Sequence, residues 1–242
     1  MTRTLLLRGM LVGLLAGVLA FVVARLLGEG PLGLGIAFEE ASEHSHDGPE
    51  LVSRGVQTTL GLGAGTLVFG VALGGLYALA YAVAQGRLGT LGVRGTALAV
   101  ALGGFLAVHL LPALKYPANP PGSTDSSTVG QRTGLYFVLL LVCVVVVVGA
   151  VVGARALSAR YGSWNGSLLG LAGAVVVLAV AYLVLPEVDE TPEGFPGSVL
   201  WDFRIASSAV QLTVWTTLGL GFGALTERSL RASAAPRVVA TV

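Results

Sequence analysis

Two histidines and three acidic residues fall within eight positions of the chain: Glu40, Glu43, His44, His46 and Asp47. Imidazole and carboxylate groups together suit divalent transition metals such as cobalt, nickel and zinc. In a helix Glu40 and His44 are neighbours, whereas in an extended chain His44 and His46 share a face. Each geometry supplies two or three ligands, which predicts a weak, exchangeable metal-capture site. The alternative is a solvated acidic loop with incidental histidines.

A third histidine, His109, lies inside an apolar run, about one turn before Pro112. An ionisable side chain in a membrane-spanning segment is a functional hypothesis by default. His109 could bind metal at the mouth of a helix bundle or carry a proton, and the alternative is a hydrogen bond to a neighbouring helix. Gln57 and Gln211 lie a few residues into two other runs, where they either line a pore or join helices.

Two segments are candidates for an external vestibule that attracts cations. Tyr116 and Asn119 lie between prolines, where freed backbone carbonyl groups could line a water-filled space. An acidic cluster would raise the local cation concentration: Glu187, Asp189, Glu190 and Glu193. The alternatives are a rigid interfacial turn and a solvated loop. We expect Phe195, just after this cluster, to be an anchor at the membrane interface.

Six apolar runs position these residues, and each is near or above the roughly 20 residues that span a bilayer as a helix. The runs are 9–27, 56–84, 95–114, 134–154, 166–185 and 205–225. A mean hydropathy of +0.83 and 11% charged residues, against about 25% in soluble domains, exclude an ordinary soluble protein. The sequence predicts an all-α integral membrane protein with about six transmembrane helices. They form one polytopic domain, residues 1–242, with external loops 28–55, 115–133 and 186–204.

Charge separates sharply between alternate gaps. One set of gaps holds a single acid, Glu227, and most of the arginines: Arg3, Arg8, Arg87, Arg94, Arg155, Arg160, Arg228, Arg231 and Arg237. All other acids lie on the opposite side. Because an excess of Lys and Arg marks the cytoplasmic face, both termini are predicted to be cytoplasmic. The acidic, histidine-bearing face is then external.

The first run has a second interpretation. Arg3 and Arg8 followed by an apolar stretch also resemble a signal peptide. The stretch is long and Arg25 can reach outward from its end, which favours a retained helix. Cleavage would leave five spans and an external N-terminus.

A weak internal repeat is present. The string TTLGLG occurs at residues 58–63 and again at 216–221. The exits of the third and fifth runs, Leu111-Pro112 and Leu185-Pro186, are also alike. Three related helical hairpins would explain these similarities, and chance likeness among glycine-rich apolar segments would explain them too.

The chain lacks the signatures of the common enzyme classes. It has no phosphate-binding P-loop and none of the usual hydrolase or metalloprotease motifs, so we do not predict an enzyme or a permanently bound cofactor. No basic patch with interleaved aromatic residues indicates nucleic acid. The single cysteine, Cys143, is expected to be a buried apolar filler.

Two longer strings carry a family resemblance. Residues 115–122 read KYPANPPG, and residues 186–196 read PEVDETPEGFP. The second leads into LWDFRIAS at 200–207, then Gln211 and Trp215. Together they resemble the CbtA family, the larger membrane subunit of a cobalt transporter, over nearly the whole chain.

The resemblance implies a function and partners. It implies a multi-pass subunit in the plasma membrane of a prokaryote, surrounded by lipid, that takes up a divalent metal ion. Cobalt is the first candidate, with nickel or zinc as alternatives. It also implies a small single-span partner subunit, CbtB, with a histidine-rich segment. The alternative function is a non-transporting membrane scaffold that hands metal to another subunit.

Overall fold

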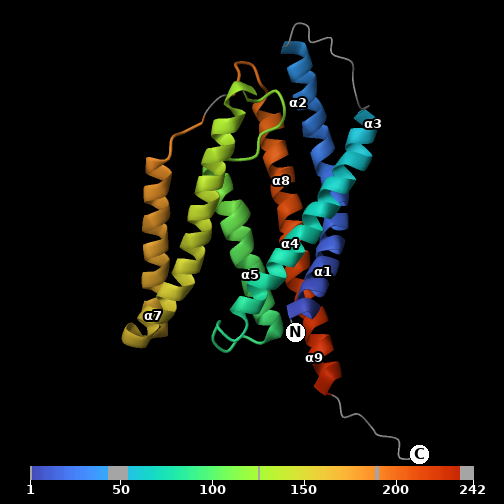
Figure 1. The fold of residues 1–242 in the computed structure, drawn as a ribbon. Coiled ribbons are helices and arrows are strands. Elements are labelled where there is room, and N and C mark those ends of the chain that lie inside the picture. The colour runs from blue at the N-terminus through green and yellow to red at the C-terminus, as the bar shows by residue number, and fades with distance from the viewer. Residues whose placement is uncertain (1, 43–53, 125, 189–190, 235–242) are drawn as a thin grey trace, which may run out of the picture. The chain divides into compact units, whose positions relative to one another are not determined.

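The computed structural model describes residues 2–42, 54–124, 126–188 and 191–234 (Figure 1). Within these ranges all regular structure is helical, which confirms the all-α prediction. The α-helices are α1 (Thr2–Val23), α2 (Glu29–Ser42), α3 (Arg54–Val56), α4 (Leu62–Ala84), α5 (Val93–Gly104), α6 (Leu111–Lys115), α7 (Val129–Val184), α8 (Gly197–Thr217) and α9 (Gly223–Ala234). Four π-helical turns interrupt them: η1 (Ala24–Gly28), η2 (Gln57–Gly61), η3 (Phe105–Leu110) and η5 (Leu218–Phe222). A short 3-10 turn, η4 (Ser126–Thr128), precedes α7.

Five helices of the described chain are long and apolar enough to cross a membrane: Thr2–Ala41, Thr59–Ala84, Val93–Lys115, Val129–Val184 and Gly197–Ala232. The longest of these contains two of the six predicted runs. Gly162 interrupts α7 with φ 80° and ψ 161°, a conformation that glycine adopts without the steric cost of a Cβ. The chain doubles back there, and a Cβ at Gly170 would lie 2.9 Å from the carbonyl oxygen of Ala150 (Figure 1).

The first helix extends well past its predicted end. Residues 28–42 were expected to belong to an external loop, but they continue the helix to Ser42. The 40-residue segment Thr2–Ala41 is about 60 Å long at ~1.5 Å per residue, against ~30 Å for the hydrocarbon core of a bilayer. An ion pair between Arg25 and Glu29, at 3.0 Å, supports the continuation. The segment is therefore about twice as long as the hydrocarbon core is thick.

Prolines account for two of the π-helical turns. A proline inside a helix removes an N–H donor, and its ring collides with the carbonyl group four residues earlier. That carbonyl group belongs to Leu27 for Pro31 and to Val108 for Pro112, and both residues lie inside a π-helical turn. The wider turn relieves the collision, which allows the helix to continue through the proline.

The described residues form two compact units. Unit 1 draws on Met1–Val22, Arg54–Leu102 and Leu212–Val242, and its centre is a crossing of α1 with α4. A Cβ at Gly9 or Gly13 would collide with the carbonyl oxygen of Gly74 or Gly70, respectively. Glycine at these positions therefore lets the two backbones touch, as is common between membrane helices. Beside them, Tyr77 and Tyr81 pack edge-on against Phe222, with ring centroids 5.3 and 4.9 Å apart.

Unit 2 draws on Val23–Ser53 and Gly103–Gln211. Its α2 helix packs at Gly35 against the turn at Pro120 and Pro121, where a Cβ would lie 2.8 Å from the Pro121 carbonyl oxygen. The rings of Phe38 and Phe195 meet edge-on at 4.9 Å. Phe195 is only 8% exposed, so its prediction as an interfacial anchor was wrong because α2 extends far enough to cover it. Cys143 is fully buried and free, as expected.

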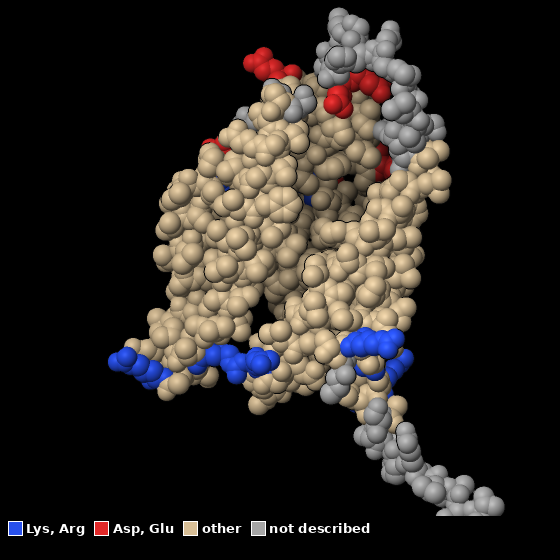
Figure 2. Space-filling view, in the orientation of Figure 1, with Lys and Arg blue, Asp and Glu red and all other residues tan. Residues whose placement is uncertain are grey.

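Charge is segregated within each unit (Figure 2). In unit 1 the arginines gather where α1 begins and where α9 runs out. In unit 2, Arg155 and Arg160 lie where α7 turns back, and acidic residues lie at the opposite end, over α2. Glu227, the one acid on the arginine-rich side, lies 2.6 Å from Arg94 and 3.3 Å from Arg231.

Candidate functional site

His109 lies in the π-helical turn η3 of unit 2 and reaches across to α8. Its Nε2 is 3.3 Å from the hydroxyl oxygen of Ser208, and its ring centroid is 5.6 Å from that of Phe105. The π-helical turn arises from Pro112, so this proline shapes the turn that carries the histidine. The contact joins two membrane-spanning helices through polar atoms.

One face of α8 carries a line of polar side chains. Arg204, Ser208 and Gln211 are spaced four and three residues apart, which places them on the same side of the helix. The Ser208 hydroxyl donates to the Arg204 carbonyl oxygen at 2.8 Å, and Arg204 Nη2 donates to Asn119 Oδ1 at 2.8 Å. Gln211 Oε1 and Arg204 Nε are buried without a hydrogen-bond partner among the described residues.

Tyrosines satisfy backbone carbonyl groups around Pro112. Val108 would accept a helical hydrogen bond from residue 112, but proline has no N–H to donate. The hydroxyl of Tyr136, on α7, donates to this carbonyl oxygen at 3.3 Å. Tyr182, also on α7, donates to Leu111 in the same way. These bonds fasten the η3–α6 segment, and with it His109, to both limbs of α7.

Tyr116 and Asn119 line a cavity of about 280 Å³ in unit 2. The other lining residues are Pro117, Val129, Arg132, Thr133, Tyr136 and Val188. Burial raises the pKa of Tyr116, so its phenol stays protonated and donates to the Pro186 carbonyl oxygen at 2.7 Å. The charged group in this described lining is Arg132, whose Nε donates to Thr128 Oγ1 at 3.1 Å. Glu187 and Glu193 are exposed and do not line the cavity.

Several candidate residues fall outside what the structure describes. Glu43, His44, His46 and Asp47 do so, as do Asp189 and Glu190 and the side chain of Gln57. Glu40 is exposed near the end of α2. Among the side chains that are described, no three His, Cys, Asp or Glu groups come together as a metal site. The structure therefore brings His109 against the face of α8 that carries Gln211. The metal-capture site at residues 40–47 stays a prediction.

Three polar residues around His109 were not predicted from the sequence: Ser208, Tyr136 and Tyr182. A signal existed for Tyr136, because Pro112 must leave the carbonyl group of Val108 in need of a donor. Ser208 could have been found by its spacing, since it lies midway between Arg204 and Gln211 on one helical face. For Tyr182 the sequence holds no comparable signal, because its position depends on how α7 doubles back.

The apolar helices, the segregated charges and the polar line between η3 and α8 define a multi-pass membrane protein. Its sequence places it in a particular family. A family model described as "Probable cobalt transporter subunit (CbtA)" matches residues 2–227, nearly the whole chain, and the protein belongs to this family. No curated protein and no solved structure matches the chain. The protein is therefore a membrane subunit of a probable cobalt transporter.

Proposed function

We propose that this subunit takes up a divalent transition metal, with cobalt as the first candidate and nickel or zinc as alternatives, from an acidic, histidine-bearing external face. The protein would lie in the plasma membrane of a prokaryote with both termini in the cytoplasm. Family membership supports the metal, and the excess of arginine on one side supports the direction.

The observation that carries the proposal is the polar line of unit 2. Burying polar atoms among apolar helices costs free energy unless they are hydrogen-bonded or used. Ser208 lies within reach of His109, but Gln211 Oε1, one turn along the same face, has no partner among the described residues. Imidazole is a good ligand for cobalt, nickel and zinc, whereas hydroxyl and amide oxygens are weak neutral ligands, so one imidazole with two such oxygens makes an incomplete, exchangeable site. A weak series of such ligands suits an ion that must move on.

Capture would come before this step, at the external end. Glu40, Glu43, His44, His46 and Asp47 supply ligands for a weak site, and the carboxylates of Glu187 and Glu193 add negative potential. Phe38 of α2 packs against Phe195 of the third loop, which places the described acids Glu40 and Glu193 in the same unit as His109. Tyr116 and Asn119 then belong to the outer lining of the route.

We also propose a partner. The resemblance of the chain implies a small single-span subunit, CbtB, with a histidine-rich segment that delivers metal. A weak, exchangeable capture site fits such a delivery, because a tight site would hold the ion back. Uptake without the partner would mean that this chain transports metal alone. Uptake only with the partner would mean that the two subunits form an obligate complex.

A scaffold that hands metal to another subunit is the second candidate. The α1–α4 crossing of unit 1 favours it, because backbones in contact leave no space for an ion there. The His109–Ser208 contact would then serve helix association alone. Transport by the partner without this chain would support the scaffold.

The test is uptake of radioactive cobalt by cells that lack cobalt import. They express this chain with and without a small histidine-rich partner, with nickel and zinc as competitors. Replacing His44 and His46 together with alanine should reduce uptake at limiting metal and much less at high metal, because capture is the affected step. A matched variant with Ser42 and Ser45 replaced by alanine controls for the loop. Absence of uptake in every combination, with membrane insertion confirmed, would leave the scaffold.

A further inference from the structure

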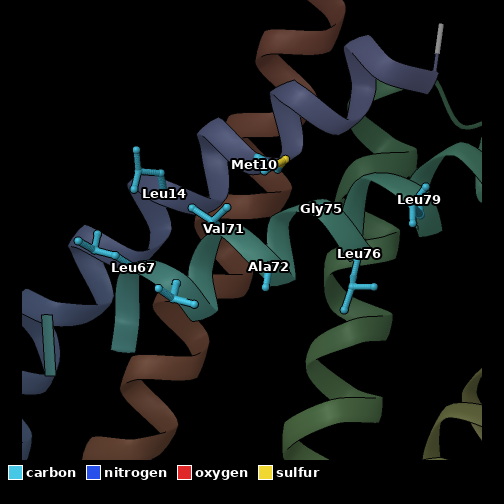
Figure 3. A pocket seen from close by; sticks show the side chains of 9 residues that line it. Met10, Leu14, Leu67, Val71, Ala72, Gly75, Leu76 and Leu79 are labelled. Atoms are coloured by element: carbon cyan, nitrogen blue, oxygen red, sulfur yellow. The ribbon is translucent and has the colours of Figure 1, made fainter. Parts of the chain in front are cut away.

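An apolar groove runs along the outside of unit 1 (Figure 3). Its volume is about 650 Å³, and its lining comes from α1 and α4: Met10, Leu14, Leu67, Val68, Val71, Ala72, Gly75, Leu76 and Leu79. The glycine crossing creates it, since two backbones in contact leave their flanking side chains as ridges on either side. Gly75 keeps the floor low, because a Cβ there would lie 3.7 Å from Met10 Cγ.

Every side chain that lines the groove is apolar, and both helices belong to membrane-spanning segments. A hydrocarbon chain is therefore the matching ligand. The groove extends along α4 from Leu67 to Leu79, about 18 Å at ~1.5 Å per residue. One leaflet contributes about 15 Å to the hydrocarbon core, so the groove is as long as a single acyl chain in one leaflet.

Arginines lie beyond the Met10–Leu79 end of the groove. Arg3 is seven residues before Met10 and shares its face of α1, and it is exposed. Arg87 follows the end of α4, and its Nη1 donates to the Val83 carbonyl oxygen at 2.6 Å, which holds the guanidinium at that helix terminus. Arg3 lies about 10 Å past the apolar lining by helical rise, and Arg87 lies in the turn just after α4 ends at Ala84, so both arginines lie beyond the apolar lining, at the level of lipid head groups. A head group at this end would meet positive charge from both walls.

We propose that this groove binds one acyl chain of an anionic phospholipid, with the head group held by Arg3 and Arg87. The lipid comes from the leaflet on the side where α1 begins. Its chain covers the small residues Ala72 and Gly75, and its phosphate compensates the two arginines. The lipid thereby seals the outer surface of the α1–α4 crossing. This site is independent of metal transport.

The first test fills the groove. Ala72 is exposed on its floor, so Ala72→Phe occupies the acyl position without entering the packed core. Ala80→Phe makes the same change at an exposed position of α4 outside the lining. Full-length protein is released from vesicles of phosphatidylglycerol and phosphatidylethanolamine, and retained lipid is counted by native mass spectrometry. We expect one retained phosphatidylglycerol on the wild type and on Ala80→Phe, and loss of that lipid from most of the Ala72→Phe protein, because the phenyl ring occupies the position of the acyl chain.

The second test removes the charge. Neutralising Arg3 and Arg87 to glutamine should abolish the preference for phosphatidylglycerol, by about fivefold for each arginine, while phosphatidylethanolamine is still retained. The double variant Arg155→Gln and Arg160→Gln, exposed on α7, should keep the preference. Equal lipid retention by Ala72→Phe and Ala80→Phe overturns the proposal. So does a change of oligomeric state in Ala72→Phe with lipid unchanged, which would assign the groove to a second copy or a partner helix.

Discussion

A histidine inside a membrane-spanning segment costs free energy unless its ring nitrogens have hydrogen-bond partners or bind a ligand. His109 has a partner in Ser208, at 3.3 Å, but this contact uses one ring nitrogen and leaves open what the other does. The hydroxyl of Ser208 already donates to the Arg204 carbonyl oxygen, so towards His109 it acts as an acceptor. The histidine then presents its N–H to Ser208 and keeps the lone pair of its other nitrogen. A lone pair is what a metal ligand requires.

Replacing His109 with alanine should therefore lower maximal cobalt uptake, by about tenfold or more, with less effect on apparent affinity. Capture at the external loop precedes this position, which is why affinity changes less. The measurement is the initial rate of uptake over a range of metal concentrations. Ser208→Ala is the matched control, since it removes the interhelical bond and keeps the imidazole. A wild-type rate of uptake in His109→Ala would show that the histidine only holds the two helices together.

The guanidinium of Arg204 is also partly buried, and its hydrogen bonding is incomplete. It donates to Asn119 but has a buried Nε without a partner among the described residues. A buried donor that loses its acceptor costs more free energy than a pair replaced by apolar groups. The Asn119 contact therefore stabilises the protein mainly because it gives the partly buried guanidinium an acceptor. The hydrogen bond by itself contributes less free energy.

Asn119→Ala should accordingly destabilise the protein by about 1–3 kcal/mol, and Arg204→Met in the same chain should recover part of that loss. Thermal unfolding in detergent, followed through the two single variants and the double variant, measures the coupling. Additive effects of the two substitutions would show that Arg204 gains nothing from Asn119.

Among the elements, α1 and α4 show how glycine spacing fixes a helix pair. Gly9, Gly13 and Gly17 recur every four residues and face Gly74, Gly70 and Thr66 of the antiparallel helix. In lipid the hydrophobic effect does not drive two apolar helices together, so close backbone approach has to supply the attraction. The same glycines also create the groove beside the crossing.

Gly70→Ala should destabilise unit 1 by about 1–3 kcal/mol, because the new Cβ collides with the Gly13 carbonyl oxygen and backbone cannot move aside cheaply. Gly65→Ala is the matched control on the same helix, since a Cβ there meets nothing within 4 Å. Thermal unfolding in detergent compares the two. Equal stability of both variants would contradict the crossing.

At the scale of the molecule, the sequence predicted the helical class well because long apolar stretches in lipid have one solution, the helix. It located the ends of helices poorly. Pro31 suggested a loop, yet a π-helical turn carries the helix on to Ser42. His109 and Gln211 were identified by their chemistry alone, whereas the contact of Tyr182 with Leu111 depends on how α7 doubles back, and that is decided by packing. The repeat of TTLGLG was no guide, since Gly219 is tightly packed and Gly61 is open.

Orientation is the property on which the direction of transport depends. The arginines near residues 87–94 and 155–160 predict that these turns, and both termini, are cytoplasmic. A green fluorescent protein fused after Val242 should fluoresce, and alkaline phosphatase fused after Gly48 should be active, since each reporter works on one side only. Exchanging the two reporters should silence both fusions, which controls for expression. An inactive phosphatase after Gly48, with fluorescence there instead, would place His44 and His46 inside the cell. Uptake through an external capture site would then be impossible, and the same residues would instead have to release or export the metal.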